Sequence, residues 1–405
     1  MRYGLLGRKL GHSYSPAIHG MLGYDYGLLE REPEELEAML KNGDFVGINV
    51  TIPYKKDVLP YLDEIDPLAQ RLGAVNTIVR RNGKLIGYNS DYYGFKSMVQ
   101  RTGIDVAGKK ALVLGSGGAS ATARAVLEDL GARVVVISRS GENNYQNLHL
   151  HADAALLVNT TPVGMYPGTG AAPVEVSRFP ELEGVLDVIY NPARTQLLLD
   201  CERLGIPGWN GLWMLVAQAV QSSRWFQDKE LSEDLVADIH RILRDRMENI
   251  ALIGMPGCGK STVGRLLAAQ TGKEFVDADT EIEKLAGKPI PRIFAEDGED
   301  HFRNLETQAL AVLGKRSGLV IATGGGCVTR EENHPLLHQN SRILWLRRDP
   351  EKLPTAGRPV SQTIAPATLY QMRKPMYKAF ADAAVDNDGS VEETLAAILD
   401  ILEVL

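Results

Sequence analysis

The segment 254–262 constrains the fold of this chain more than any other, because its sequence GMPGCGKST fits the pattern GxxxxGK[ST]. An apolar stretch, 250–253, precedes it, and a run typical of a helix, 263–269, follows it. In such a strand–loop–helix unit the glycines let backbone N–H groups converge on phosphate oxygens. The pattern predicts that Lys260 reaches the β and γ oxygens of a nucleoside triphosphate and that the Ser261 hydroxyl holds Mg²⁺. By itself the loop fits many kinases and ATPases. The nucleotide-binding residues predicted in this loop are Gly257, Cys258, Gly259, Lys260, Ser261 and Thr262.

A second glycine turn, GSGGAS at 115–120, stands earlier in the chain. It follows a predicted strand at 109–114 and opens an Ala-rich helical run, which is the setting of a dinucleotide site. The next predicted strand, 133–137, leads into Ser138 and Arg139, where an NAD site has an acidic residue for the ribose diol. An arginine flanked by hydroxyls suits a 2′-phosphate, so the sequence favours NADP(H). The predicted cofactor-binding residues of this region are Gly115, Gly117, Gly118, Ala119, Ser138 and Arg139.

Composition sets broader limits. A length of 405 residues suggests two or three domains, and 44% hydrophobic with 23% charged residues is ordinary for a globular protein. A net charge of −7 without any basic run argues against a nucleic-acid partner. The three cysteines, Cys201, Cys258 and Cys327, form no CxxC pair and predict a reducing compartment. Neither a signal peptide nor an apolar run of membrane-spanning length is visible, so we expect a cytoplasmic protein without a membrane partner.

Predicted strands and helices alternate almost throughout the chain, which indicates parallel α/β layers. A strand is expected at 2–6. Asn82-Gly83, standing between the apolar stretches 77–80 and 84–86, predicts a hairpin, because both central residues tolerate positive φ. A long helical run, 212–226, is expected to return to the first region of the chain.

Seven phrases stand in order within the first 226 residues. They are GHSYSPAIH (11–19), GINVTIPYK (47–55), GAVNT (73–77), GYNSDYYGF (87–95), NTTPVGM (159–165), DVIYNP (187–192) and GLWMLVAQA (211–219). Together they resemble the signatures of the shikimate dehydrogenase family. The resemblance implies that Lys55 and Asp91 are the catalytic pair, and that Gly211 and Met214 lie at the NADP site. The substrate-binding residues that it implies are Ser13, Ser15, Asn49, Thr51, Asn76, Tyr190 and Gln218.

The chemistry explains why a lysine and a carboxylate are needed. Hydride delivery to a ketone builds negative charge on oxygen, and a proton must arrive there. A free lysine, with a pKa of ~10.4, is a poor acid–base group near neutrality, whereas partial burial and a neighbouring carboxylate adjust and position it. We expect Lys55 to donate the proton in reduction and to accept it in oxidation.

Two features depart from the family pattern. Tyr92 and Tyr93 follow Asp91 where the pattern has Asp-Gly, and this change could reshape the pocket wall. The stretch 141–153 is short and polar, which could loosen the adenosine end of the cofactor site.

Further motifs narrow the function of the phosphate loop. They are FVDAD (275–279), HFRNLE (301–306), ATGGGC (322–327), RP (358–359) and RKPMY (373–377). In the first, Asp277 and Asp279 are expected on one face at the i, i+2 spacing of a strand. In the second, Arg303 is expected on a helix. Together the motifs resemble shikimate kinase over about 249–403.

By that likeness, Asp279 binds the acceptor hydroxyls and is the candidate catalytic base beside Lys260, while Asp277 lies near Mg²⁺ through water. Arg358 stands in the place of the lid arginine and would contact ATP. The span 349–358 is short and lacks the arginine that faces adenine, so ATP affinity and lid closure are the least secure features. The acceptor and its carboxylate would be bound by Asp279, Arg303, Gly324, Gly325, Gly326 and Arg373.

The two resemblances imply consecutive reactions: reduction of 3-dehydroshikimate to shikimate with NADPH, then phosphorylation of shikimate to shikimate 3-phosphate with MgATP. One alternative is quinate as the dehydrogenase substrate. Another is a non-catalytic regulator that senses shikimate or quinate, although the presence of Lys55, Asp91, Lys260, Ser261 and Asp279 argues against it. The oligomeric state and the transfer of shikimate between the sites stay open.

The expected fold class is therefore α/β throughout: an N-terminal α/β substrate domain and a Rossmann NADP domain, followed by a P-loop kinase domain with a parallel sheet. Leu231, Leu235, Ile239 and Ile242 stand at helical spacing and predict a connecting helix. The expected divisions are 1–100 with 211–226 for the substrate domain, 101–210 for the NADP domain, 227–248 for the linker and 249–405 for the kinase domain.

Overall fold

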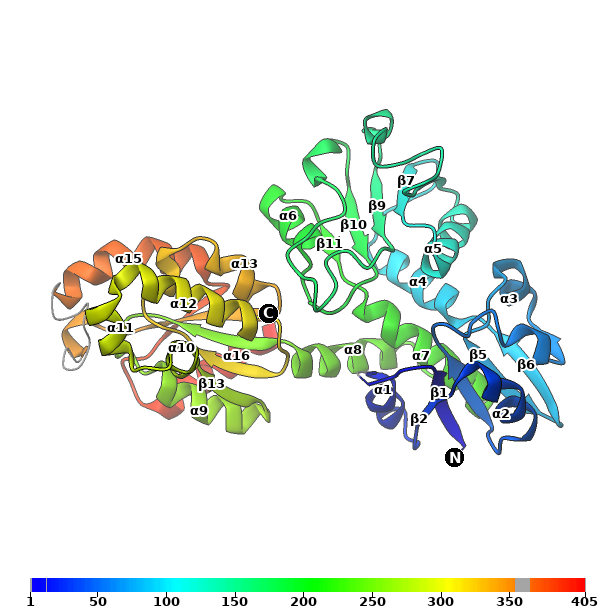
Figure 1. The fold of residues 1–405 in the computed structure, drawn as a ribbon, viewed down its shortest axis with the longest axis horizontal. Helices are drawn as coiled ribbons and strands as arrows, with labels where there is room; N and C mark the ends of the chain where they lie inside the picture. The colour runs from blue at the N-terminus through cyan, green and yellow to red at the C-terminus, as the bar shows by residue number, and fades with distance from the viewer. Residues whose placement is uncertain (1, 12, 354–364, 405) are drawn as a thin grey trace. The chain divides into compact units, whose positions relative to one another are not determined.

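The computed structural model describes residues 2–11, 13–353 and 365–404 (Figure 1). The chain folds into two compact units, and each brings together segments that are distant in sequence. They are Met1–Tyr190 with Leu197–Arg244 as the first unit, and Asn191–Gln196 with Asp245–Leu405 as the second.

Six strands near the N-terminus form the first sheet of the first unit. They are β1 (Tyr3–Gly7), β2 (Gly27–Glu30), β3 (Gly47–Val50), β4 (Glu64–Ile65), β5 (Thr77–Arg81) and β6 (Lys84–Tyr88). Their order is β2-β1-β3-β5-β6-β4, with β5 antiparallel to both of its neighbours. The predicted hairpin is confirmed, because Asn82 (φ 51°) and Gly83 (φ 78°) join β5 to β6. The helices of this stretch are α1 (Ser15–Met21), η1 (Pro33–Glu35), α2 (Leu36–Asn42), η2 (Leu59–Tyr61), α3 (Pro67–Leu72) and α4 (Ser90–Arg101).

Five parallel strands form the second sheet of this unit. They are β7 (Lys110–Leu114), β8 (Arg133–Ile137), β9 (Leu156–Asn159), β10 (Gly184–Asp187) and β11 (Gly208–Trp209). Their order is β11-β10-β9-β7-β8, so the chain leaves β7 for β8 on one side and returns to β9 on the other. Such a reversal opens a ligand crevice at the carboxyl end of the strands, where the glycine turn stands. The helices of this stretch are α5 (Gly118–Asp129), η3 (Leu148–His151), η4 (Val176–Arg178) and α6 (Gln196–Leu204).

Helix α7 (Leu212–Gln227) links the two sheets of the first unit. It packs along α4 and also contacts α1 and β3, as expected for a helix that returns to the first region. Gly94 makes the close approach possible, since a Cβ there would lie 2.7 Å from the Met214 carbonyl oxygen. The predicted connecting helix is α8 (Asp234–Met247), which begins later than expected and leaves Leu231 outside it.

The second unit is built on one parallel sheet, as predicted. Its strands are β12 (Asn249–Ile253), β13 (Glu274–Asp277), β14 (Leu319–Ala322), β15 (Ser341–Arg347) and β16 (Ala383–Asp386). The order is β13-β14-β12-β15-β16, and every residue of the central strand β12 is buried. The helices are α9 (Lys260–Thr271), α10 (Ala278–Ala286), α11 (Ile290–Glu296), α12 (Gly298–Leu313), η5 (Cys327–Thr329), α13 (Asn333–His338), η6 (Pro350–Lys352), α15 (Pro366–Phe380) and α16 (Val391–Val404).

Two further sequence expectations can be compared with this fold. Cys201, Cys258 and Cys327 are buried and carry free thiols. None of the helices within the described residues has the length and apolar character needed to cross a bilayer.

Candidate active sites

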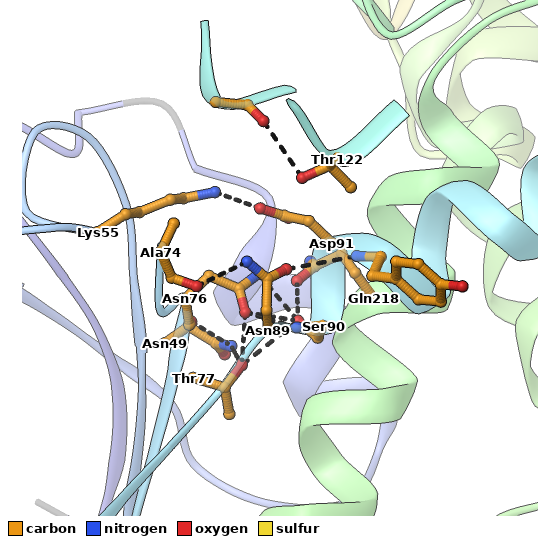
Figure 2. A network of polar contacts seen from close by, with 12 residues as sticks. Asn49, Lys55, Ala74, Asn76, Thr77, Asn89, Ser90, Asp91, Thr122 and Gln218 are labelled. Atoms are coloured by element: carbon orange, nitrogen blue, oxygen red, sulfur yellow. Dashed lines mark hydrogen bonds and ion pairs between the residues drawn. The ribbon is translucent and has the colours of Figure 1, made fainter. Parts of the chain in front are cut away.

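Lys55 and Asp91 form an ion pair in the first unit. Lys55 lies in the turn after β3, and Asp91 lies in the first turn of α4, where Asn89 caps the helix by accepting the Tyr92 N–H. The Lys55 Nζ donates to the Asp91 Oδ2 at 2.5 Å, and the two side chains are 29% and 20% exposed. Figure 2 shows the two side chains pointing toward one another. The pair is therefore shielded enough to hold its geometry and open enough to meet a ligand.

A buried hydrogen-bond network lies beside this pair (Figure 2). The Asn76 Oδ1 accepts the backbone N–H of Ser90 at 2.6 Å, and its Nδ2 donates to the Ser90 hydroxyl at 3.0 Å. That hydroxyl lies 3.1 Å from the Gln218 Oε1. The residue directly before β5, helix α4 and helix α7 are thus joined through the side chains of Asn76, Ser90 and Gln218, and Asn76 and Gln218 are predicted substrate ligands.

Asn49 belongs to the same network but is committed to the protein. Its Oδ1 accepts the Tyr26 hydroxyl at 2.7 Å, and its Nδ2 lies within 3.1 Å of both the Thr77 and the Ser222 hydroxyls. Only 6% of Asn49 is exposed. The structure therefore places Asn49 where it orients its neighbours, with its amide already hydrogen-bonded on both sides.

The other predicted substrate ligands come from chain segments next to these elements. Ser15 is the first residue of α1, and its N–H donates to the Ser13 hydroxyl at 3.2 Å. Thr51 directly follows β3, and its N–H donates to the Leu6 carbonyl at 2.9 Å. Tyr190 follows β10, and burial raises the pKa of its phenol.

The dinucleotide turn has the shape that a pyrophosphate requires. Gly115 adopts φ +108°, and helix α5 begins at Gly118 without a side-chain cap, so its first N–H groups face outward. Among the described residues, apart from the adjoining backbone, no atom lies within 4 Å of a Cβ placed on Gly117 or Gly118. Open space in front of a helix N-terminus fits a bound phosphate group, so these residues fit NADP.

Ser138 and Arg139 stand at the carboxyl end of β8. Arg139 is exposed, whereas the Ser138 N–H donates to the Asn143 carbonyl at 3.1 Å. Asn144 and Asn147 add hydrogen bonds within the same loop, including Asn144 N–H to the Asn147 Oδ1 at 2.8 Å. The short stretch after Arg139 is therefore held by its own asparagines, and its effect on the adenosine end of the site stays a prediction. The remaining predicted NADP residues lie at the start of α7, where Gly211 is the N-cap and Met214 lies one turn further along the helix.

Tyr92, which was expected to reshape the pocket wall, takes part in helix packing. Its ring is buried in the apolar core between α4 and α5, and its hydroxyl donates to the Asp129 Oδ2 at 2.6 Å. Asp129 also pairs with Arg71 of α3 at 2.5 Å. Tyr92 thus ties helices together and does not form the pocket wall.

The second unit contains a cavity of about 530 Å³ at the phosphate loop. Nearly all the kinase residues predicted from the sequence line it. They are Gly257, Gly259, Lys260, Ser261, Thr262, Asp277, Asp279, Arg303, Gly324, Gly325, Gly326 and Arg373. Arg358 lies outside the described residues, and Cys258 is fully buried behind the loop with its N–H donating to the Met255 carbonyl at 3.1 Å.

The phosphate loop is shaped by glycines with positive φ, Gly257 at 82° and Gly259 at 99°. The Lys260 Nζ donates to the carbonyls of Gly254 and Met255 at 2.9 and 3.0 Å. Asn387, which follows β16, supports the loop from behind by donating to the Cys258 carbonyl at 2.5 Å. The sequence interpretation did not assign Asn387 this role.

Asp277 and Asp279 do not share a strand, which corrects the i, i+2 expectation. Strand β13 ends at Asp277, which caps α10 by accepting the Asp279 N–H at 3.1 Å, and Asp279 is already helical. A cap-forming Asp after an apolar strand ends it, since its carboxylate satisfies the first helical N–H groups. Asp277 also accepts the Ser261 hydroxyl at 2.7 Å.

Asp279 has unusual electrostatics. Its Oδ1 is buried without a hydrogen-bond partner among the described residues. Burial, reinforced by the negative charge of Asp277, raises the pKa of Asp279 to about 6. A carboxylate with these properties suits both an incoming hydroxyl donor and proton transfer near neutrality.

Arg303 lies opposite, on α12. It pairs with Glu306 at 2.7 Å and Glu299 at 3.0 Å, and a Cβ on Gly326 would collide with its guanidinium. Arg373 donates to the Gly325 carbonyl at 3.0 Å. Glu306 is fully buried, and burial raises its pKa. The sequence interpretation missed Glu306, although the i, i+3 spacing from Arg303 is the spacing of a helical ion pair.

The side chains at the phosphate loop can be compared with the ligands that Mg²⁺ requires. Among the described residues, no group of three or more His, Cys, Asp or Glu side chains is placed to hold a metal. Mg²⁺ at nucleotide sites takes one or two protein ligands together with phosphate oxygens and water, and the Ser261–Asp277 pair fits that requirement.

The first unit is thus that of a Rossmann-type oxidoreductase with a lysine–carboxylate pair, and the second is that of a P-loop phosphotransferase. The family model for the shikimate dehydrogenase substrate binding domain matches residues 5–78, and the model for shikimate kinase matches residues 256–403.

Comparison with known proteins agrees. The shikimate dehydrogenase (NADP(+)) of Clostridium beijerinckii is 35% identical over 268 residues, covering 61% of this chain and 99% of that protein. The crystal structure of shikimate dehydrogenase 1 from Peptoclostridium difficile is 38% identical with a TM-score of 0.55, over 60% of this chain and 98% of that one. The shikimate 5-dehydrogenase of Thermus thermophilus, solved with NADP(H) and shikimate, is 31% identical with a TM-score of 0.54, again over 60% and 98%.

The chain belongs to the shikimate dehydrogenase family and carries a shikimate kinase domain at its C-terminal end. The two domains together indicate a bifunctional enzyme of the shikimate pathway.

Proposed function

We propose that the first unit reduces 3-dehydroshikimate to shikimate with NADPH, and that the second unit phosphorylates the shikimate 3-hydroxyl with MgATP. One observation supports this most: a single chain holds a shielded Lys55–Asp91 pair and also a phosphate-loop cavity with a buried Asp279 carboxylate oxygen that has no partner in the described part of the chain.

In the reduction, Lys55 donates a proton to the substrate oxygen on which charge develops, and Asp91 keeps the ammonium in position. The reduced nicotinamide supplies the hydride when it is bound. Ser13, Ser15 and Thr51 offer hydroxyl groups to the substrate carboxylate and ring hydroxyls. Asn49, Asn76 and Gln218 are held by the buried network, and Tyr190 lies beside them. Such fixed donors lower the barrier because they need little reorganisation during the reaction.

The cofactor preference rests on Arg139. Its exposed guanidinium after β8 suits the 2′-phosphate of NADP, and no acidic residue stands there for a ribose diol. Arg139→Ala should raise the KM for NADPH far more than the KM for NADH. Equal effects on the two cofactors would remove this assignment.

In the phosphorylation, Asp279 accepts the hydroxyl proton of the acceptor while the carboxylate of the acceptor meets Arg303 and Arg373. Lys260 and the loop N–H groups hold the phosphate chain, and Ser261 with Asp277 would hold Mg²⁺. Bound Mg²⁺ neutralises charge on the phosphates. Phosphoryl transfer depends chiefly on positioning and charge neutralisation, and these residues provide both.

The domain assignment is part of the proposal: residues 1–100 with 211–226 bind the substrate, 101–210 bind NADP, and 249–405 form the kinase. We also propose a cytoplasmic location, which the three free thiols support.

The test is to measure the two half-reactions separately on the purified chain. Oxidation of NADPH should require 3-dehydroshikimate, and conversion of ATP to ADP should require shikimate. Preference for quinate over shikimate in the reverse oxidation would redirect the first assignment, and ATP turnover independent of shikimate would contradict the second.

A further inference from the structure

Four cationic side chains line the kinase cavity within the described part of the chain, and three of them are bound by the protein itself. Lys260 donates to loop carbonyls, Arg303 pairs with glutamates, and Arg373 donates to the Gly325 carbonyl. Arg348 differs, because its Nε is buried without a hydrogen-bond partner among the described residues. No resemblance assigned a role to Arg348.

Arg348 lies at the phosphate loop. It directly follows β15, which pairs in parallel with β12, the strand that leads into the loop. A Cβ on Gly259 would lie 3.9 Å from the Arg348 Nη1. The guanidinium is therefore next to the backbone that forms the phosphate cradle.

The carboxylate nearest in charge to Arg348 is engaged by other groups. Asp388 accepts the Asp349 N–H at 3.0 Å and lies 3.3 Å from the Lys352 Nζ, and it interacts with Arg348 through charge alone, without a hydrogen bond among the described residues. A buried guanidinium nitrogen without a partner is costly, and an anion that supplies charged acceptors would compensate it.

We propose that Arg348 binds a phosphate oxygen of the nucleotide and so is a further nucleotide-binding residue of the kinase site. This inference rests on the proposed kinase function. Arg348 would add a cation at the loop in a chain whose sequence, by the family resemblance, lacks the arginine that faces adenine.

The neighbouring Arg347 offers a matched control. Arg347 is the last residue of β15, donates to Asp386 at 2.9 Å and does not line the cavity, whereas Arg348 does. Arg348→Gln and Arg347→Gln therefore remove the same charge one residue apart.

The experiment is calorimetric titration of the full-length wild type and both variants with MgATP and, separately, with magnesium tripolyphosphate, which has no base or ribose. We expect Arg348→Gln to weaken both ligands by roughly 10- to 100-fold, as for a lost charged hydrogen bond, and Arg347→Gln to leave both near wild type. Unchanged circular dichroism and an unchanged unfolding midpoint of the kinase unit check that each variant is folded.

Three results would overturn the inference. If Arg348→Gln binds both ligands like wild type, Arg348 does not contact the nucleotide. If only ATP is weakened, Arg348 contacts the base or ribose and the phosphate assignment is wrong. If the wild-type protein binds neither ligand, the proposed kinase function fails first, a result that is distinct from the other two.

Discussion

The dehydrogenase and kinase sites differ in how far their buried polar groups satisfy one another. In the first, Lys55 is bonded to Asp91, and Asn76 is bonded to Ser90 through both ends of its amide. In the second, the Asp279 Oδ1 and the Glu306 Oε1 are buried without partners among the described residues. One site is assembled by the fold, whereas the other keeps unpaired groups for its ligands.

The two sites therefore differ in how much their buried polar groups destabilise the fold. A buried polar atom without a partner costs ~1–3 kcal/mol, so the kinase cavity holds free energy that a suitable ligand can recover. The polar groups of the dehydrogenase network are largely hydrogen-bonded to one another. Its ligands therefore meet groups whose orientation is already set. Removing any one of these residues should disturb the orientation of the others.

The largest expected effect is the loss of dehydrogenase activity when the proton donor is removed. Lys55→Ala should lower dehydrogenase kcat by roughly 10²–10⁴-fold, because the proton donor is gone, while shikimate phosphorylation stays at the wild-type rate. Lys56→Ala, an exposed neighbour, is the control and should change neither. Steady-state rates of both reactions decide, and near-normal reduction by Lys55→Ala would refute the role of Lys55.

The next effect tests the ligand-dependent site through stability. Since the folded-state pKa of Asp279, about 6, exceeds the ordinary value of ~3.9, folding favours the protonated form. The stabilisation from this group is therefore fully present below about pH 4 and is lost as the pH rises from about 4 to about 6, by roughly 2–3 kcal/mol for the kinase unit. Asp279→Asn should raise the free energy of unfolding at pH above this range while it lowers kinase kcat.

Asp277→Ala provides the contrast for that prediction. It removes the oxygen that caps helix α10 and should lower stability at the same pH by ~0.5–2 kcal/mol. Denaturant unfolding of both variants at two pH values separates the two effects. If Asp279→Asn also destabilises, burial of the Asp279 charge is not a cost to the fold.

A smaller effect concerns the support of the phosphate loop. Asn387→Asp replaces the amide donor to the Cys258 carbonyl by an acceptor of the same shape, so it should raise KM for ATP about tenfold. Thr394 donates to the Asn387 Oδ1 at 2.7 Å, so Thr394→Val should act in the same direction. Thr394→Ser keeps the hydroxyl and should remain near wild type. A change in KM for shikimate alone would contradict the proposed support of the loop.

The smallest effect lies outside both pockets. Tyr92→Phe removes the hydrogen bond to Asp129, which still keeps Arg71, so the first unit should lose about 1 kcal/mol of stability with its KM for shikimate unchanged. Tyr93→Phe is the matched control. A shift in the KM for shikimate in Tyr92→Phe would restore the original interpretation that Tyr92 reshapes the pocket wall.

Local sequence patterns predicted much of the fold. Asn82-Gly83 specified the hairpin, since few residue pairs accept two positive φ values, and the two glycine turns lie between strand and helix as expected. The predicted start of α8 was wrong, because Leu231 fits the apolar period of the helix but lies outside it. Its carbonyl accepts a hydrogen bond from the Arg224 guanidinium. Periodicity does not detect such contacts.

The sites were predictable where a motif fixes both residue type and position. Asp277 and Asp279 were assigned to one strand because their i, i+2 spacing fits a strand. The local sequence does not show that the chain turns into a helix at Asp277, where its carboxylate becomes the helix cap. Arg348 and Asn387 gave no local signal, since their positions at the loop follow from pairing of β15 and β16 with distant strands. The roles of the site residues stay predictions until the variants are measured.

The central claim is that two independent sites in one chain act on a shared metabolite, and a coupled assay with 3-dehydroshikimate, NADPH and MgATP tests it most directly. Wild type should form shikimate 3-phosphate, Lys260→Ala should stop at shikimate, and a mixture of Lys55→Ala with Lys260→Ala should restore the phosphorylated product through free shikimate. Loss of reduction in Lys260→Ala, failure of Lys55→Ala to phosphorylate added shikimate, or shikimate that the wild-type protein never phosphorylates, would contradict these independent sites.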